Sequence, residues 1–345
     1  MKKPIATAVA LAGSVALLTA CGASTGAGDA MTFVSWGGEG QAMQEQFWTD
    51  PFAEANDITV VQDSPTDYAK LQAMIESGNV SWDVVQVATD IAVSKCGTQL
   101  EPIDRSAVDM SQIEPSLIFS ECGLPVLQQS FVMVYNEDLF GDAPPTSIMD
   151  FFDTAKYPGK RGLWDYAAPG QIELALMADG VAPESLYPLD YERGLAKLDT
   201  LRNDISWYGT TAQSTEQLNS GGVAMALVYS GRAYTAAKDG APYAPVWSTG
   251  MRATDQLVIP KGAPNKEAAQ KFLSYIATPA PQERLAAEVP YGPTVVGANV
   301  DLDELNRKFS ATGSGQLDKT HVVDMKWWSE NNDILDQAWL TWQAG

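Results

Sequence analysis

The feature that most constrains the fold is a regular alternation of strand-like and helix-like segments that starts at residue 31. β-Branched and aromatic residues predict strands over 31–36, 58–62 and 82–87. Between these strands, apolar residues recur with helical spacing over 39–55 and 66–77. Because strands that alternate with helices favour a parallel sheet, the pattern predicts an α/β fold.

The same style of sequence continues through the rest of the chain. Further strands are predicted over 131–135, 161–164, 223–229 and 256–259. Further helices are predicted over 171–178, 191–201, 232–239 and 266–276, and C-terminal helices around 327–328 and over 335–342. The 345 residues are enough for two compact bodies, and the sequence contains no visible internal repeat.

The first thirty residues predict export. Two lysines precede an apolar stretch over 5–18, which has the length of a signal-peptide core and is short for a membrane span. The small residues before Cys21 resemble the lipobox of bacterial lipoproteins, which implies cleavage before Cys21 and a lipid anchor on its sulfur. We therefore predict a lipoprotein signal peptide over 1–20, a Gly-rich tether over 21–30 and an extracytoplasmic location. An ordinary or uncleaved signal peptide is the alternative.

The two remaining cysteines are candidates for a disulfide. Outside the cytoplasm, a pair of leftover thiols favours a bond between them rather than a redox centre. Cys96 and Cys122 each precede a glycine, as loop cysteines often do. Their bond would close a loop of about 26 residues, worth roughly 3–4 kcal/mol in the chain-entropy model. Two free buried thiols are the alternative.

Composition excludes several classes of function. The chain has 43 acidic and 22 basic residues, a net charge of −21, and lacks the basic surface that a nucleic-acid-binding protein needs. One histidine and three cysteines supply too few ligands for a Cys/His metal centre. No nucleophile motif accompanies the single His321, so a histidine-based catalytic triad is not expected. We therefore expect no metal, no cofactor and no nucleic-acid partner.

Several short motifs occur in a fixed order along the chain. They are FVSWGGE at 33–39, YAKL at 68–71, WDVV at 82–85, YPGK at 157–160, VYSGR at 228–232, DQLVIP at 255–260, NKEA at 265–268 and YGPT at 291–294. In this order the chain resembles the extracytoplasmic solute-binding components of ABC importers, in the branch that contains spermidine/putrescine-binding proteins and γ-aminobutyrate-type binders. The resemblance implies a type II periplasmic-binding-protein-like fold with a ligand cleft between two lobes. It also implies a monomer without enzymatic activity that works with a membrane permease.

The resemblance also implies how the chain is divided. The first lobe is expected to comprise 31–135 and about 252–299, and the second lobe 136–251 and about 300–345. Proteins of this architecture close by hinge motion, so the chain is expected to pass between the lobes at a few loop positions.

Four aromatic residues are candidates for ligand contact. Open α/β sheets bind ligands at the carboxyl ends of their strands. Trp36, Trp164 and Tyr229 stand at predicted strand ends, and Tyr291 lies in one of the family motifs. Because aromatic faces attract ammonium groups, we expect these side chains to line a site for an organic cation, whereas most other aromatic residues belong to the core.

Three acidic residues are candidates for binding an amino group. Asp255 matches the acidic position that polyamine-binding relatives use, and Glu39 and Asp90 lie on loops where relatives present polar or acidic groups. The second acidic pair of those relatives aligns with Ala167 and Gly170 here. This departure from the family pattern argues against a long polyamine.

Arg232 changes the expected ligand. It stands where spermidine binders carry a small polar residue, and its guanidinium suits a carboxylate and repels an ammonium group. Together with Asp255 it predicts a zwitterion such as γ-aminobutyrate, with a polyamine left open. A salt bridge from Arg232 to Asp239 or Glu216 is the alternative reading of this residue.

Two other functions are compatible with an exported acidic protein. A hydrolase would need paired carboxylates or a nucleophile with its base, and no acid stands in such a pattern. An iron-binding relative of the fold would present adjacent tyrosines, and the sequence has no Tyr-Tyr pair. We therefore expect a receptor that captures a small amine-bearing solute, a polyamine or an ω-amino acid. The remaining alternatives are a binder of another small organic solute or metal complex in the same fold, and an exported hydrolase.

Overall fold

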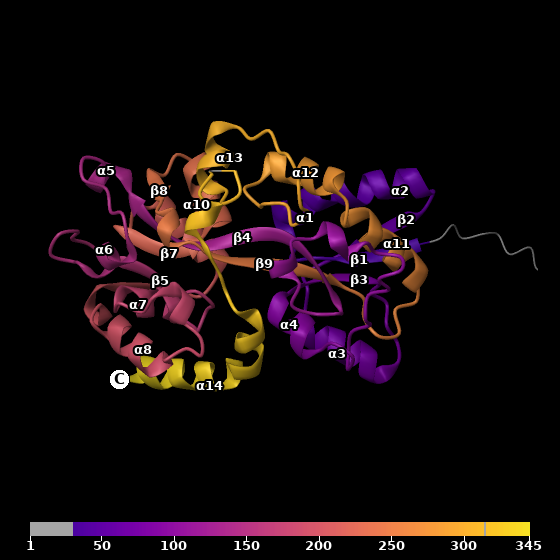
Figure 1. Ribbon diagram of the computed structural model, residues 1–345, viewed down its shortest axis with the longest axis horizontal. Coiled ribbons are helices and arrows are strands. Elements are labelled where there is room, and N and C mark those ends of the chain that lie inside the picture. Colours follow the sequence, from indigo (N-terminus) through magenta and orange to yellow (C-terminus); the bar gives the residue numbers. More distant parts are fainter. Residues whose placement is uncertain (1–29, 314) are drawn as a thin grey trace, which may run out of the picture.

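The computed structural model describes residues 30–313 and 315–345 (Figure 1). Its strands form one mixed sheet in the order β2-β1-β3-β9-β4-β7-β5-β6, with β10 beside β9 and β8 beside β4. The strands are β1 (Ala30–Val34), β2 (Thr59–Asp63), β3 (Val84–Ala88), β4 (Gly123–Asn136), β5 (Arg161–Trp164), β6 (Ile205–Tyr208), β7 (Met225–Tyr229), β8 (Tyr243–Pro245), β9 (Met251–Val258) and β10 (His321–Val322). The predicted signal peptide and Cys21 lie outside the described residues.

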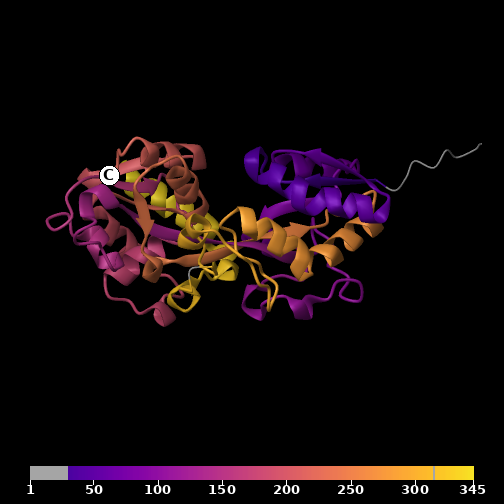
Figure 2. The ribbon, with the colours of Figure 1, turned by 90° about the horizontal axis from the view of Figure 1, so that it is seen from above.

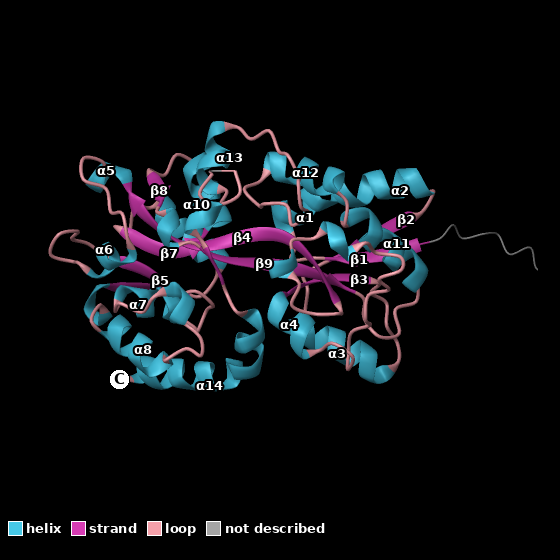
Figure 3. Ribbon diagram, in the orientation of Figure 1, coloured by secondary structure: helices cyan, strands magenta, loops and turns pink. Residues whose placement is uncertain are grey.

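Helices cover both faces of this sheet (Figure 3). They are α1 (Gly38–Gln44), α2 (Asp50–Asn56), α3 (Tyr68–Ser77), α4 (Thr89–Ser94), α5 (Glu137–Phe140), α6 (Ile148–Phe152), α7 (Gln171–Ala178), α8 (Tyr191–Asp199), α9 (Thr211–Asn219), α10 (Ser230–Lys238), α11 (Lys266–Ile276), α12 (Pro279–Glu288), α13 (Glu304–Phe309) and α14 (Met325–Ala344). A π-helical turn, Glu45–Thr49, joins α1 to α2. No helix in the described part of the chain is long and apolar enough to cross a membrane.

Two long antiparallel strands, β4 and β9, run through the middle of the molecule. One end of β9 pairs with β3, from Ala88 beside Asp255 to Val85 beside Val258. The C-terminal part of β4 pairs with β7, and the two long strands pair with each other along most of their length. The register shifts between Val126 and Gln128, because Leu127 adopts a left-handed backbone conformation with φ 54°. This bulge bends β4 where the strand passes from one half of the sheet to the other.

The buried apolar side chains form four clusters that fall into two pairs. Every buried member of the first pair lies within 31–126 or 257–295, and every buried member of the second pair lies within 131–251 or 309–339. Figure 2 shows the corresponding two groups of elements, joined by β4 and β9. We call them the first half and the second half of the molecule. Burial of each cluster stabilises its own half, and the two long strands are shared.

The C-terminal segment forms one helix where two were expected. α14 runs unbroken for 20 residues and packs against both α8 and α4 (Figure 1). Trp328, Leu335 and Trp339 are buried in the core of the second half, which confirms the expected packing role of Trp328. Asp324 caps the helix by accepting a hydrogen bond from the Trp327 backbone N–H at 2.9 Å.

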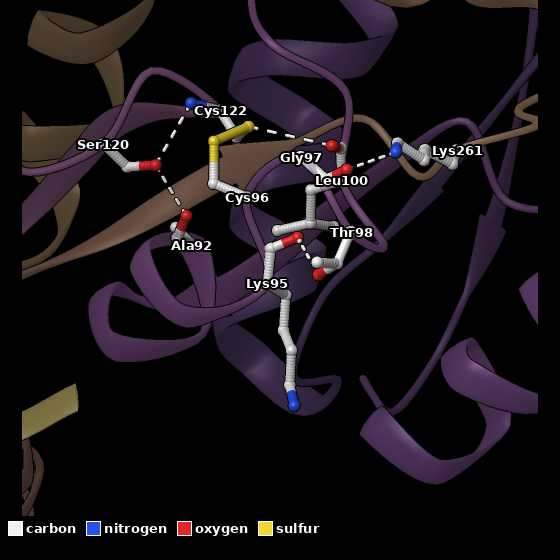
Figure 4. The surroundings of a disulfide bond; sticks show 9 residues. All are labelled: Ala92, Lys95, Cys96, Gly97, Thr98, Leu100, Ser120, Cys122 and Lys261. Carbon is white, nitrogen blue, oxygen red and sulfur yellow. Dashed lines mark hydrogen bonds between the residues drawn. A yellow bond between two sulfur atoms is a disulfide. The ribbon is translucent and has the colours of Figure 1, made fainter. Parts of the chain in front are cut away.

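The expected disulfide is present and lies beside α4 (Figure 4). It joins Cys96, just after α4, to Cys122, just before β4, with 5.4 Å between their Cα atoms. Ser120 reinforces the junction, because its hydroxyl donates to the Ala92 carbonyl at 2.6 Å and accepts from the Cys122 N–H at 3.1 Å. The bond therefore fixes the end of α4 against the start of a strand that runs through both halves.

Candidate ligand-binding site

The carboxyl ends of β1, β3, β5 and β7 supply the side chains of the candidate site. Trp36 follows β1, Asp90 opens α4 after β3, Trp164 ends β5 and Tyr229 ends β7. Asp255 is contributed by β9, which lies between β3 and β4 in the sheet. The rule that ligands bind at strand ends therefore selects residues from both halves of the molecule.

Asp255 is the most constrained side chain of the group. Its Oδ2 accepts hydrogen bonds from Trp36 Nε1 at 2.9 Å and from Gln86 Nε2, and Gln129 Nε2 approaches its Oδ1 at 3.4 Å. Burial raises the pKa of Asp255 to about 6, and the nearby charge of Asp90 adds to that rise. The desolvation cost of the charged form outweighs the stabilisation that the neutral donors supply. A cation beside this carboxylate would remove that cost.

Two aromatic side chains of the first half stand beside Asp255. The rings of Trp36 and Tyr68 meet edge to face at a centroid distance of 6.2 Å, and Trp36 remains 43 % exposed. The Tyr68 hydroxyl accepts a hydrogen bond from the Ala88 N–H at 3.2 Å, which ties α3 to the end of β3. An exposed tryptophan whose indole N–H already serves an acid keeps its ring face available to a ligand.

A second group of aromatic side chains belongs to the other half of the molecule. Trp164 is buried, and its ring lies 5.0 Å from Tyr166, 4.8 Å from Tyr208 and 6.0 Å from Tyr229. No hydrogen-bond partner for Trp164 Nε1 is found among residues 30–313 and 315–345. A buried donor of this kind is costly unless a ligand or a water molecule accepts from it. Tyr166 is 43 % exposed, and burial together with the charges of Asp165 and Asp336 raises its pKa to about 12.

The same two carboxylates raise the pKa of one tyrosine in each aromatic group. Burial raises the pKa of Tyr68, and the charges of Asp90 and Asp255 raise it further. The same is true of Tyr229, with Tyr166 as an additional cause. Asp90 and Asp255 thus act on one tyrosine from each half. We call Trp36, Tyr68, Asp90, Trp164, Tyr166, Tyr229 and Asp255 the aromatic–acid site.

Asp90 is held by a contact from the C-terminal helix. Its Oδ2 accepts a hydrogen bond from Asn332 Nδ2 of α14 at 3.2 Å. Burial raises the pKa of Asp90. Hydrogen bonds from the backbone N–H groups of Asp90 and Ile91 and from the Asn332 amide lower it, but by less. Asp90 is therefore a second carboxylate at the site, opposed by no basic side chain within the described part of the chain.

Arg232 lies in the first turn of α10, three residues after Tyr229. Its side chain is half-buried, and it makes no ion pair or hydrogen bond with any residue that the structure describes. The expected alternative, a salt bridge to Asp239 or Glu216, is therefore not formed. Asp239 Oδ2 instead accepts a hydrogen bond from Asn219 Nδ2 at 3.4 Å. Among the described residues, the guanidinium of Arg232 is therefore left without a carboxylate partner.

The remaining predicted residues lie elsewhere or are not described. The ring of Tyr291 is packed against Gly231, where an added Cβ would lie 2.8 Å from the tyrosine hydroxyl. Tyr291 is thus next to Arg232, and its contact with ligand stays a prediction. Glu39 falls in α1, but its side chain is outside the described set. Arg252 donates to Gln128 Oε1 at 3.0 Å and lies 3.6 Å from the Glu114 carboxylate.

Comparison with known proteins decides the family. Residues 48–307 match the family model described as a bacterial extracellular solute-binding protein. The chain belongs to this family. It is 34 % identical over 322 residues to the gamma-aminobutyric acid-binding protein of Pseudomonas aeruginosa, an alignment that covers 91 % of both chains. It is 23 % identical over 257 residues to the spermidine/putrescine-binding periplasmic protein of Escherichia coli, covering 70 % of this chain and 72 % of the relative.

Solved structures agree with that assignment. A solved GABA receptor superposes on this solute-binding protein with a TM-score of 0.82 at 36 % identity, covering 91 % of this chain and 98 % of the receptor. The periplasmic binding-protein fold expected from the sequence is confirmed. The protein is thus an extracytoplasmic solute-binding protein of an ABC transporter and not an enzyme.

Sequence reasoning missed several residues around the site of this solute-binding protein. Gln86 and Gln129 both reach Asp255, and Asn332 reaches Asp90. Tyr68 was expected to share an apolar helix face with Leu71 and Ile75, but Leu71 is buried while Tyr68 is 36 % exposed beside Trp36. Its place in the first helical turn after a strand end is the signal that could have identified it.

Proposed function

We propose that this solute-binding protein captures a small ω-amino acid of the γ-aminobutyrate type. The ligand ammonium binds at Asp255, and the ligand carboxylate binds at Arg232. Trp36, Tyr68 and Tyr229 enclose the short apolar stem between the two charges. The gamma-aminobutyric acid-binding relative and the GABA receptor structure support the same ligand class for this chain.

The observation that carries this proposal is that Arg232 and Asp255, the two charged residues proposed to bind the ligand, each lack a partner of opposite charge. Arg232 is a half-buried cation with no anionic partner among the described residues, and Asp255 is an enclosed carboxylate with neutral donors only. Each charge lacks the opposite charge that would offset its desolvation. A zwitterion supplies both at once, whereas a diamine would place an ammonium group near Arg232.

The test is a comparison of Arg232→Gln with Arg105→Gln. Both variants remove one positive charge, but Arg105 is exposed and lies in the connection between α4 and β4. Loss of a charge-assisted hydrogen bond is worth about 1.5–3 kcal/mol, so calorimetric Kd for γ-aminobutyrate should rise by about 10- to 100-fold in Arg232→Gln. Arg105→Gln should stay within about twofold of the wild type. Equal affinities in the two variants would show that Arg232 does not bind the ligand carboxylate.

A polyamine is the second candidate, because Asp90 provides a second carboxylate that acts on the same tyrosines as Asp255. The spermidine/putrescine-binding relative supports this possibility. In the same titrations, a diamine ligand would bind Arg232→Gln at least as tightly as wild type, because removing the guanidinium removes a repulsion. Putrescine binding that Arg232→Gln strengthens, without any γ-aminobutyrate binding to wild type, would move the assignment to polyamines.

We further propose that ligand capture closes two lobes and that the loaded monomer docks on a membrane permease. The lobes comprise 31–135 with about 252–299, and 136–251 with about 300–345. Closure should lower the radius of gyration in solution scattering when γ-aminobutyrate is added. An unchanged radius at saturating ligand would argue against hinge closure.

The proposed membrane attachment depends on Cys21. We propose that cleavage before Cys21 and acylation of its sulfur tether the protein to a membrane surface. Mass spectrometry of the protein purified from membranes should show the lipid mass on an N-terminal Cys21. A Cys21→Ser variant should be recovered without lipid, whereas a wild-type protein cleaved at another residue would support the ordinary signal peptide instead.

A further inference from the structure

The C-terminal helix belongs to one half of the molecule and touches the other. Trp328, Leu335 and Trp339 anchor α14 in the core of the second half, and the helix also packs along α8. The same helix lies against α4, which packs on β3 and β9 in the first half (Figure 1). α14 therefore spans the junction on the side of the aromatic–acid site.

One polar contact marks the point where α14 meets α4. Asn332 Nδ2 donates to Asp90 Oδ2 at 3.2 Å across 242 positions of sequence. One turn further along α14, the charge of Asp336 acts on Tyr166 of the site. The charge of Asp90 raises the pKa of Asp255 of β9, Tyr68 of α3 and Tyr229 of β7, and α14 carries the acids Glu330, Asp333 and Asp336 near Asn332 in the sequence. None of these groups can donate to Asp90 as a cation, so the Asn332 amide is its side-chain donor.

We propose that Asn332 is a positioning residue that acts through Asp90, aiming this carboxylate at the bound amine and joining α14 to α4 across the two halves with or without ligand. The binding consequence rests on the proposed function. The mechanical consequence, that α14 restrains α4, does not. Hydrogen bonds to charged groups are stronger than those between neutral groups, so one side chain can affect both the position of Asp90 and the contact between α14 and α4.

The first test compares Asn332→Ala with Asn331→Ala. Asn331 is its neighbour on the same helix and donates only within the helix, to the Trp327 carbonyl at 2.7 Å. Kd for γ-aminobutyrate should rise about tenfold in Asn332→Ala and less than twofold in Asn331→Ala. The low-pH limb of the affinity profile should also move to higher pH in Asn332→Ala, because the ionised form of Asp90 loses a donor. Equal affinities and equal pH profiles in the two variants would overturn the proposal.

A second variant controls for a general effect on the helix. Asn332→Asp places two carboxylates face to face and should weaken binding more than Asn332→Ala does. Combining Asn332→Asp with Asp90→Asn reverses the donor and the acceptor, so without ligand the α4 amides of the double variant should exchange more slowly than those of Asn332→Asp alone. Exchange in α4 that is equally fast in the double and the single variant would contradict a direct contact between the two side chains.

A ligand-free measurement separates this proposal from the proposed function. Hydrogen–deuterium exchange of the α4 amides should be faster in Asn332→Ala than in Asn331→Ala without any ligand. If wild type binds no titrated amino acid, the proposed function fails while the exchange result still supports or overturns the role of Asn332. If exchange in α4 is the same in both variants, the role of Asn332 fails even when γ-aminobutyrate binds.

Discussion

Replacing Asp255 with asparagine should stabilise the unliganded protein while abolishing its binding of amines. Burial raises the pKa of Asp255 from 3.8 to about 6, so the charged side chain lowers the free energy of unfolding at neutral pH. A pKa change of one unit corresponds to about 1.4 kcal/mol, which gives about 3 kcal/mol for this carboxylate. Asparagine is neutral and nearly isosteric, so it avoids that cost.

The local geometry allows this substitution. The asparagine oxygen can occupy the position of Oδ2 and accept from Trp36 Nε1 and Gln86 Nε2, as Asp255 does. Its amide nitrogen then replaces Oδ1, where Gln129 makes only a long contact at 3.4 Å and can turn its own oxygen inward. Because hydrogen bonds to a charged acceptor are stronger than those to an amide, the net gain should be about 1–3 kcal/mol at pH 7.5.

The pH dependence identifies the cause. As the pH falls from about 6 towards 3.8, the folded protein holds a proton on Asp255 that the unfolded chain does not, so lowering the pH selectively stabilises wild type. The advantage of Asp255→Asn should therefore fall by about 2 kcal/mol between pH 7.5 and pH 4.5. Urea unfolding of both proteins at pH 7.5 and 4.5 measures this difference, with Asp142→Asn in an exposed loop as the control. An Asp255→Asn protein that is less stable than wild type at pH 7.5, or equally shifted at both pH values, would refute the reasoning.

Three further predictions follow from the same contacts. Kd for γ-aminobutyrate should rise about tenfold between pH 7 and pH 5, because Asp255, with a pKa of about 6, must be ionised to bind an ammonium group. A calorimetric Kd that does not change over this pH range would exclude Asp255 as the ammonium-binding group. Trp36→Phe keeps a ring beside Tyr68 but loses the donor to Asp255, so amine affinity should fall about 3- to 10-fold in calorimetry, and an unchanged Kd would show that this donor is dispensable. Replacing Cys96 and Cys122 together with serine should lower the free energy of unfolding by about 3–4 kcal/mol for a sequence separation of 26, with reduced wild type as the comparison.

The elements with strong local patterns were predictable from the sequence. The strand β5, Arg161–Trp164, and the helices α7, Gln171–Ala178, and α11, Lys266–Ile276, have the bounds that hydrophobic spacing predicts. Trp36, Asp90, Trp164 and Tyr229 could be selected because the rule for strand ends needs only the order of strands and helices, whereas Asp255 was selected from the family resemblance.

The long strands could not be predicted in full. The sequence indicated strands over 131–135 and 256–259, whereas β4 is Gly123–Asn136 and β9 is Met251–Val258. Residues 123–130 contain glycine, proline and two glutamines, and residues 251–255 include Arg252 and Asp255, so neither has a local preference for a strand. Their extended form is stabilised by pairing with each other, which is a tertiary interaction between segments more than 100 residues apart.

The side chains that hydrogen-bond to the acidic residues of the site could not be predicted for the same reason. Asn332 meets Asp90 because Trp328, Leu335 and Trp339 anchor α14 in the second half, and nothing near Asn332 in sequence signals that meeting. Gln86 lies in a strand whose neighbours are buried apolar residues, so its amide could be assigned to Asp255 only when β3 and β9 were seen to pair.

The stability cost at Asp255 and the unpaired state of Arg232 have one common consequence. Had the two side chains formed an ion pair with each other, each would have offset the other's desolvation, and no charge would remain for a ligand. In the unliganded protein the cost at Asp255 is retained, which lowers the free energy of unfolding. Under the proposed function, a zwitterionic ligand whose ammonium group meets Asp255 recovers this cost as binding free energy, so part of its affinity derives from the instability of the empty site. The same proposal predicts that a ligand without an ammonium group recovers none of this cost, and that a ligand without a carboxylate leaves Arg232 without an anionic partner.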